Sequence, residues 1–216
     1  MSVTVFEALT LIRVIPVVEI VDPSTAVELA ETLMAAGLPT MEITLRTEGA
    51  LTAIALIHQA YPEFLVGAGT LVTASQVTNA VTAGARFGVS PGYSPEVSAA
   101  AEQLDFPLVP GAVTVTEVLA ARSSGHQFLK FFPAEQSGGA AVIQSMVSPL
   151  AALEVKFMPT GGVKLTNLAT YLQLPNVFAV GGTWIAPRDQ IAARDFAAIS
   201  DCATAVVELL TDIPVP

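Results

Sequence analysis

Residues 64–84 read Phe64-Leu-Val-Gly-Ala-Gly-Thr-Leu-Val-Thr-Ala-Ser-Gln-Val-Thr-Asn-Ala-Val-Thr-Ala-Gly84. Residues 64–67 form a short apolar run typical of a buried strand, and the glycine and threonine that follow are typical of a turn. Segment 74–83 then predicts a helix, with Gly84 at its C-terminal cap. The stretch therefore predicts one β/α unit, made of a strand, a glycine-containing turn and a helix.

The same order of elements recurs along the whole chain. Strands are predicted at residues 14–20, 40–45, 64–67, 86–90, 107–109, 127–132, 155–158 and 177–180. Helices are predicted at residues 24–36, 49–59, 74–83, 95–103, 115–123, 139–148, 165–172 and 188–210. Helix-start patterns support them, such as Ser94-Pro95-Glu96 and the capping-box spacing of Thr114 and Glu117.

Strands that alternate with helices indicate a parallel sheet, and eight such units favour a TIM (β/α)8 barrel. A chain of 216 residues allows about 27 residues per unit, which is compact but sufficient. A doubly wound open sheet is the alternative. No linker or shift in composition divides the chain, so we expect a single domain over residues 1–216. Residues 1–13 predict an extra N-terminal helix at the bottom of the barrel.

The composition is that of a folded protein with an unusually apolar interior. Hydrophobic residues make up 52% of the chain, charged residues 13%, and the mean hydropathy is +0.62. Such a chain can bury a large core, which excludes disorder, and parallel strands buried on both faces would account for the apolar excess. Charges or prolines interrupt every apolar stretch before the ~18–20 residues of a spanning helix, so we expect no membrane segment.

The net charge limits the possible binding partners, and the N-terminal sequence bears on the location of the protein. A net charge of −10, an isoelectric point of about 4.5 and the lack of a Lys/Arg cluster disfavour nucleic acid and anionic membranes. An anionic substrate would need local binding groups, because the overall field repels it. The N-terminus lacks the basic segment of a secretory signal, so a cytoplasmic protein is expected.

Few residues could bind a metal. The single Cys202 excludes a disulfide framework and a cysteine-ligated cluster. His58 lies in a predicted helix and His126 in a turn, so structural roles are expected for both. No closely spaced set of His, Asp and Glu suggests a catalytic metal.

Lys130 is the first candidate for chemistry, because reactive groups in a barrel lie at the C-terminal ends of strands. Large apolar residues surround it in Phe128-Leu-Lys-Phe-Phe-Pro133, and desolvation favours the neutral amine that Schiff-base formation requires. The alternative is a lysine whose stem packs on the barrel while its amine reaches solvent. Lys156 starts its strand and is expected near the bottom, and Lys164 is expected near phosphate or simply exposed.

The second predicted strand places Glu42, Thr44 and Arg46 on one face, because side chains alternate along a strand. Such groups are costly to bury unless they are paired or used. The functional interpretation makes Glu42 a proton shuttle and Arg46 a bidentate clamp for a carboxylate. The alternative is an internal Glu42–Arg46 ion pair or a solvated strand end.

Glycine-rich segments end several strands. Pro159-Thr-Gly-Gly162 and Gly181-Gly-Thr183 follow the seventh and eighth predicted strands, where barrels often bind phosphate with backbone N–H groups. Tight strand-to-helix turns also favour glycine, which is the alternative explanation. Gly67-Ala-Gly-Thr70 and Ser90-Pro-Gly92 end strands in the same way and are candidates to line the pocket.

Six motifs carry a resemblance to a known family. They are Glu42-Ile-Thr-Leu-Arg46-Thr47, Val66-Gly67-Ala68-Gly69-Thr70, Ser90-Pro91-Gly92, Lys130-Phe131-Phe132-Pro133-Ala134-Glu135, Pro159-Thr160-Gly161-Gly162 and Gly181-Gly182-Thr183-Trp184. In order and spacing the chain resembles the KDPG/KHG class I aldolases, which act on 2-keto-3-deoxy-6-phosphogluconate (KDPG) and 4-hydroxy-2-oxoglutarate (KHG). The resemblance runs from Ile15 to Trp184, and the segment that begins at Lys130 is its most specific part.

The resemblance implies a cytoplasmic, homotrimeric TIM barrel that cleaves KDPG to pyruvate and glyceraldehyde 3-phosphate without metal or cofactor. It implies that Lys130 forms the Schiff base and that Glu42 is the general acid/base. For the pyruvate end it implies a carboxylate held by Arg46 and Thr70, and walls formed by Pro91 and Phe132. For the phosphate end it implies binding by Thr160, Gly161, Gly162, Gly182 and Thr183.

Two features of the sequence bear on substrate choice. Thr183 stands where the family often has serine, which keeps the hydroxyl and adds a methyl group. The galactonate-specific members lack the Thr-Leu-Arg that follows Glu42, so Arg46 favours the gluconate branch. The alternatives are cleavage of KHG or of 2-keto-3-deoxy-6-phosphogalactonate with the same lysine, a phosphate-binding isomerase or epimerase, and a sugar-acid sensor without turnover.

Overall fold

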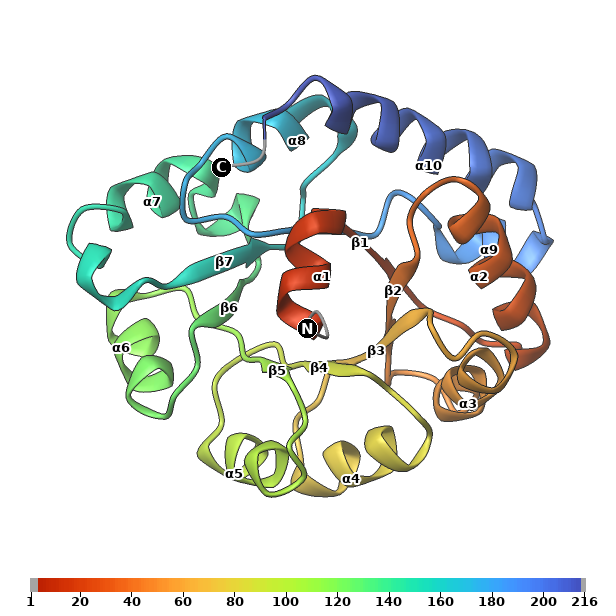
Figure 1. Ribbon diagram of the computed structural model, residues 1–216, viewed down its shortest axis with the longest axis horizontal. Helices are drawn as coiled ribbons and strands as arrows, with labels where there is room; N and C mark the ends of the chain where they lie inside the picture. The colour runs from red at the N-terminus through yellow and green to blue at the C-terminus, as the bar shows by residue number, and fades with distance from the viewer. Residues whose placement is uncertain (1–3, 215–216) are drawn as a thin grey trace.

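The protein is a closed ring of parallel strands surrounded by helices, as Figure 1 shows down the barrel axis. The computed structural model describes residues 4–214. The strands are β1 (Val14–Val18), β2 (Thr40–Thr44), β3 (Leu65–Gly69), β4 (Phe87–Val89), β5 (Leu108–Val109), β6 (Phe128–Phe131), β7 (Lys156–Pro159) and β8 (Val180–Gly182). The helices are α1 (Val5–Ile12), α2 (Ala26–Ala35), α3 (Ala50–Ala60), α4 (Ala74–Thr82), α5 (Pro95–Gln103), α6 (Val115–Ser123), α7 (Gly139–Met146), α8 (Leu165–Leu172), α9 (Arg188–Ala193) and α10 (Phe196–Thr211).

The ring closes through two ladders and three bridges. Six strands pair in the order β5-β4-β3-β2-β1-β8, and β6 pairs with β7. Parallel bridges join the two groups, one between Gly111 and Lys130 and two from the segment 157–160 to Val177 and Gly181. The predicted TIM barrel is confirmed, and the open-sheet alternative is wrong.

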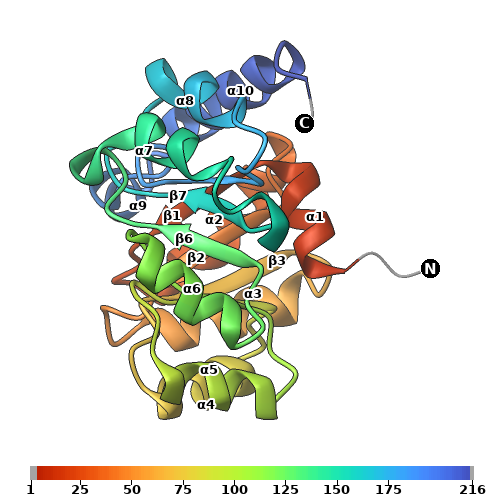
Figure 2. The same cartoon turned by 90° about the vertical axis from the view of Figure 1, so that its left-hand side faces the viewer.

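The extra N-terminal helix covers the bottom of the barrel. Thr4 and Glu7 form a capping box at the start of α1, and Leu9 is fully buried in the interior cluster. Phe6 stacks on Phe128, the first residue of β6, with ring centroids 4.4 Å apart. Figure 2 shows α1 at one end of the barrel. The predicted helix is therefore confirmed from residue 5 onward, whereas its residues 1–3 lie outside the described part of the chain.

Several predicted boundaries differ from the structure, and three of the differences bear on the fold or the site. The predicted helix 188–210 is two helices, because Arg194 adopts a left-handed conformation (φ 55°) and the Asp195 carboxylate then caps α10 at the N–H of Ala198. The strand predicted at 177–180 begins its ladder with β1 at Val180, although Val177 already forms a bridge to Phe157. The second strand ends at Thr44, so the two residues after it belong to a turn.

No helix within residues 4–214 is long and apolar enough to cross a membrane.

Candidate active site

Lys130 and Glu42 meet inside the ring. They lie on β6 and β2, which are four positions apart around the barrel, and the Lys130 ammonium donates a hydrogen bond of 3.2 Å to Glu42 Oε1. The side chains are 8% and 0% exposed. Glu42 Oε2 is buried and has no hydrogen-bond partner among the described residues. A buried charge pair with an unsatisfied carboxylate oxygen is costly, and such sites are often functional.

Strand alternation explains why both groups point inward. Met41 and Ile43 pack outward against the helices, as do Leu129 and Phe131, so the residues between them face the interior. Lys130 pairs in register with Met158, which belongs to the interior cluster. Lys130 is buried near the end of its strand, as predicted, because only 8% of its side chain is exposed.

Gly69 makes room for the Glu42 carboxylate. A Cβ atom at position 69 would overlap Glu42 Oε1 and lie 2.7 Å from Glu42 Cγ. The next residue, Thr70, adopts φ 62°, which is uncommon for a threonine and is often found at functional sites. The end of β3 therefore leaves space for the Glu42 carboxylate and is followed by a threonine in a strained conformation.

The Phe132 ring lies beside the lysine. Its ring centroid lies 5.2 Å from Lys130 Nζ, and 37% of the residue is exposed. The sequence left Phe132 undecided between the core and a pocket wall, and its exposure excludes the core. Pro91 is half-buried in the loop after β4, where its carbonyl lies against Gly111 so closely that a Cβ there would not fit.

Arg46 lies at the mouth of the barrel and is not paired with Glu42. Its guanidinium is 54% exposed and forms an ion pair of 3.3 Å with Glu19. Glu42 instead pairs with Lys130, so the alternative of an internal Glu42–Arg46 ion pair is wrong. The reason is that β2 ends at Thr44, and the chain turns before Arg46 can continue the inward face.

Sequence reasoning missed two charged residues at this mouth. Glu19 binds Arg46 and also Arg188, the first residue of α9. Glu19 follows β1 directly, so the rule that reactive groups follow strands would have found it. Arg188 carries no such signal, because its partner lies 169 residues away in the sequence.

The two glycine-rich ends lie side by side. A parallel bridge joins Thr160 to Gly181, and Gly161 and Gly162 have φ values of 97° and 79°, which favour glycine. Thr160 is buried, and its hydroxyl packs against Gly181.

At the end of β8, glycine is also required for a packing reason. A Cβ at Gly182 would overlap the Trp184 ring, so Gly182 allows this ring to pack. Thr183 between them is exposed. The structure thus brings the predicted phosphate-end residues together after β7 and β8.

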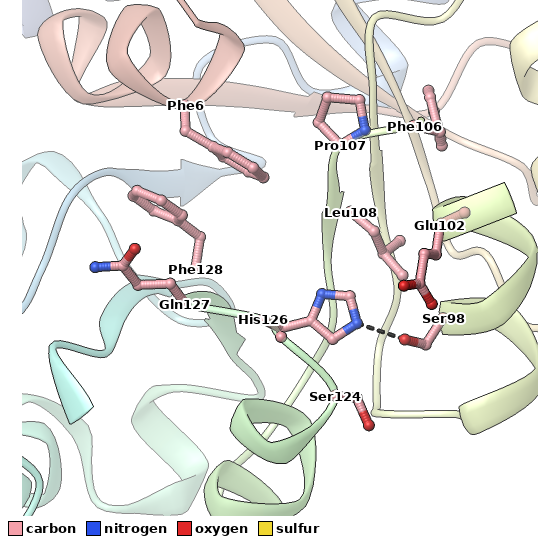
Figure 3. Close-up of a pocket in the computed structure, with 12 residues that line it drawn as sticks. Phe6, Ser98, Glu102, Phe106, Pro107, Leu108, Ser124, His126, Gln127 and Phe128 are labelled. Atoms are coloured by element: carbon pink, nitrogen blue, oxygen red, sulfur yellow. Dashed lines mark hydrogen bonds between the residues drawn. The ribbon is translucent and has the colours of Figure 1, made fainter. Parts of the chain in front are cut away.

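The remaining candidates lie away from the Lys130–Glu42 pair. Lys156 starts β7 and donates to the Pro175 carbonyl (2.8 Å), and Lys164 is exposed just before α8. His126 contacts the Ser98 hydroxyl at 2.6 Å in a cleft of about 400 Å³ beside Phe6 of α1 (Figure 3). Burial lowers the pKa of His126. Within residues 4–214, no group of three or more His, Cys, Asp or Glu side chains could hold a metal ion.

Comparison with known proteins identifies the family. Residues 5–202 match the family model described as KDPG and KHG aldolase. The chain belongs to this family. Among other aldolases, it is 42% identical to the 2-dehydro-3-deoxy-phosphogluconate aldolase of Treponema pallidum (strain Nichols), over 96% of this chain and 98% of that protein.

A second relative and a solved structure are similar to the chain over most of its length. The KHG/KDPG aldolase of Escherichia coli (strain K12) is 39% identical, over 90% of this chain and 91% of that protein. The crystal structure of KDPG aldolase from Legionella pneumophila has a TM-score of 0.89 and 38% identity, covering 93% of this chain and 97% of that one. In that crystal, pyruvate was captured at low pH as a covalent carbinolamine intermediate.

Proposed function

We propose that this aldolase cleaves KDPG to pyruvate and glyceraldehyde 3-phosphate through a Schiff base on Lys130. The observation that carries the proposal is the buried Lys130–Glu42 pair at the C-terminal end of a barrel of this family. A class I aldolase needs an amine that can lose its proton and an acid/base within reach of it. The 3.2 Å contact provides both groups in one enclosed space.

The first half of the reaction forms the imine. Glu42 takes a proton from the Lys130 ammonium, and the neutral amine attacks the C2 ketone of the substrate to give a carbinolamine. The protonated Glu42 then donates to the carbinolamine hydroxyl, which leaves as water. The resulting iminium is the electron sink for the bond between C3 and C4, so the mechanism needs neither a metal nor an organic cofactor.

The second half breaks the carbon–carbon bond. Glu42, through a water molecule, accepts the proton of the C4 hydroxyl, and the C3–C4 electrons move into the iminium. Glyceraldehyde 3-phosphate leaves, and a lysine-bound enamine of pyruvate remains. Protonation at C3 and addition of water release pyruvate and restore the amine.

The substrate ends are assigned to the residues around the pair. Arg46 and Thr70 bind the carboxylate, and Pro91 and Phe132 enclose the pyruvate half. Arg46 pairs with the Glu19 carboxylate, so the substrate carboxylate either displaces Glu19 from Arg46 or binds Arg46 beside it. The phosphate lies on the loops after β7 and β8, held by Thr160, Gly161, Gly162, Gly182 and Thr183.

The context of the enzyme is proposed from the same resemblance. We expect one catalytic domain over residues 1–216, a homotrimer, and a cytoplasmic location, with no nucleic-acid or membrane partner. Light scattering of the purified protein would test the trimer, which requires three times the 22.4 kDa of one chain.

The direct test is a cleavage assay in which pyruvate release is coupled to a dehydrogenase. KDPG, its galactonate epimer and KHG are compared by kcat/KM. The proposal predicts the highest value for KDPG, because KHG lacks the phosphate that the glycine loops bind and Arg46 favours the gluconate substrate over its galactonate epimer. Equal values for KDPG and KHG would contradict the assignment of the phosphate end. If none of the three substrates released pyruvate, the proposed aldolase activity itself would be contradicted.

A further inference from the structure

Glu135 and Tyr171 form a contact behind the proposed phosphate end that the reaction itself does not use. The Tyr171 hydroxyl donates a hydrogen bond to Glu135 Oε1. Glu135 follows the lysine strand β6, and Tyr171 lies on α8, the helix that follows the Gly161-Gly162 loop. The side chains thus join the segment that carries Lys130 to the helix that follows the phosphate loop.

The backbone of the same two segments is also joined. The Ala134 N–H donates to the Thr160 carbonyl at 2.8 Å, and the Glu135 N–H donates to the Gly161 carbonyl at 3.1 Å. The Cβ and Cγ of Glu135 lie beside Gly162, because a Cβ atom added to Gly162 would come within 2.6 Å of both. The position of Gly162 therefore depends on where the Glu135 side chain is held.

Tyr171 is well suited to hold that side chain. It is only 1% exposed, so its ring is fixed by the core around it. Burial, together with the hydrogen bond to the Glu135 carboxylate, raises the pKa of its phenol well above the ordinary value, so the phenol stays protonated and donates. Gly139, at the start of α7, leaves the space for this contact, since a Cβ there would lie 3.3 Å from the Tyr171 hydroxyl.

We propose that Glu135 and Tyr171 are positioning residues that fix the Gly161-Gly162 loop relative to Lys130, and so select substrates that carry a phosphate. This inference rests on the proposed function, because it assigns the loop to the substrate phosphate. KDPG must place its C2 carbon at the lysine and its C6 phosphate at the loop at the same time. A loop held at a fixed distance from β6 therefore favours a phosphorylated six-carbon keto acid over the shorter, unphosphorylated KHG.

The contact also controls charge at the loop. A carboxylate near a phosphate site repels the ligand unless its charge is engaged elsewhere. The Tyr171 hydrogen bond engages Glu135 and keeps its stem, rather than its carboxylate, against Gly162. Loss of the phenol hydroxyl frees the carboxylate to move toward the loop. Phosphate binding is then weakened for two reasons: the loop is held less firmly, and the carboxylate repels the phosphate.

The test compares Tyr171→Phe with the unchanged enzyme on KDPG and KHG. We expect the KM for KDPG to rise about ten-fold, as for loss of a hydrogen bond to a charged group, with kcat almost unchanged. The KM for KHG should stay within about two-fold, since that substrate does not reach the loop. Tyr61→Phe is the matched control, because Tyr61 follows α3 at the opposite end of the barrel.

Glu135 variants separate positioning from general destabilisation. Glu135→Gln keeps an oxygen that accepts from Tyr171, so it should retain a KM for KDPG close to normal. Glu135→Ala loses the positioning contact but also removes the repelling carboxylate, so its KM for KDPG should rise less than that of Tyr171→Phe, and the double variant should match Glu135→Ala. Equal increases of KM for KDPG and KHG, or a normal KM for KDPG in Tyr171→Phe, would overturn the proposal.

A binding measurement keeps the inference separate from the proposed cleavage reaction. A calorimetric titration with glycerol 3-phosphate measures binding to the loop without any turnover. Weaker binding to Tyr171→Phe than to the unchanged protein supports the inference, even if KDPG proves not to be cleaved. Equal binding to both proteins, or no binding to either, overturns it.

Discussion

The Glu42 carboxylate occupies a space that a single glycine provides. One of its oxygens accepts from Lys130 and the other is buried with no hydrogen-bond partner within residues 4–214, so a small displacement would change its contacts. Gly69 lies directly beside it, and the same strand end carries the strained Thr70. The chemistry of the site thus depends on a residue that has no reactive group.

Gly69→Ala should therefore impair catalysis through Glu42. The added Cβ overlaps the carboxylate and pushes it away from Lys130, so we expect kcat for KDPG to fall by about 100-fold. Gly37→Ala is the control. It forces alanine into a positive φ at the end of α2, which costs stability, but its Cβ meets only Val207. Normal kcat in Gly69→Ala, or a comparable loss in Gly37→Ala, would contradict this role.

At the scale of elements, the chain uses repeated local signals to start its helices. Capping boxes precede α1, α4 and α6, and a serine cap with a proline at the first position starts α5. These signals are local, so the sequence predicts the helices well. The break between α9 and α10 was not predictable in this way, because a left-handed arginine has no sequence signature.

The cap of α6 gives a pH-dependent prediction. Glu117 Oε2 accepts from the N–H groups of Val113 and Thr114 and from the Thr114 hydroxyl, which lowers the Glu117 pKa. A lowered folded-state pKa means that the stabilisation is present above the ordinary glutamate pKa and is lost as the pH falls through the lower value.

Glu117→Ala should lower the free energy of unfolding by about 1 kcal/mol at pH 7, and by less as the pH drops below about 4. Urea unfolding at several pH values measures this difference, with Glu63→Ala as an exposed control. A difference that stays constant or grows toward acid would contradict the capping role.

At the scale of the whole molecule, the two ends of the barrel have separate tasks. The C-terminal ends of the strands carry the proposed chemistry, whereas α1 closes the other end with Leu9 in the interior cluster. Stability and catalysis should therefore respond independently to changes at the two ends.

Leu9→Ala tests this separation. Removal of a fully buried leucine should cost about 3 kcal/mol of unfolding free energy, because it leaves a cavity at the barrel bottom. Thermal and urea unfolding measure the loss, and kcat/KM for KDPG at 25 °C should remain within about two-fold of normal. A large loss of activity in protein that is still folded would show that the two ends are coupled.

The barrel and the choice of Lys130 and Glu42 as candidate residues were predictable because they follow from periodic patterns, whereas the contact between the two was not. Buried strands appear as apolar runs, and a charged residue inside such a run stands out, as Lys130 and Glu42 do. Contacts between distant segments leave no such pattern. Glu19 with Arg188, and Glu135 with Tyr171, become partners only when the ring closes, and the exposed position of Arg46 follows from the early end of β2.

Reductive trapping tests the central role of Lys130 most directly. The enzyme is incubated with pyruvate and borohydride, digested, and analysed by mass spectrometry. We expect one modified lysine, Lys130, in the unchanged protein and in Lys156→Ala, and neither trapping nor cleavage in Lys130→Ala. Trapping at another lysine, or full cleavage of KDPG by Lys130→Ala, would contradict the Schiff-base role.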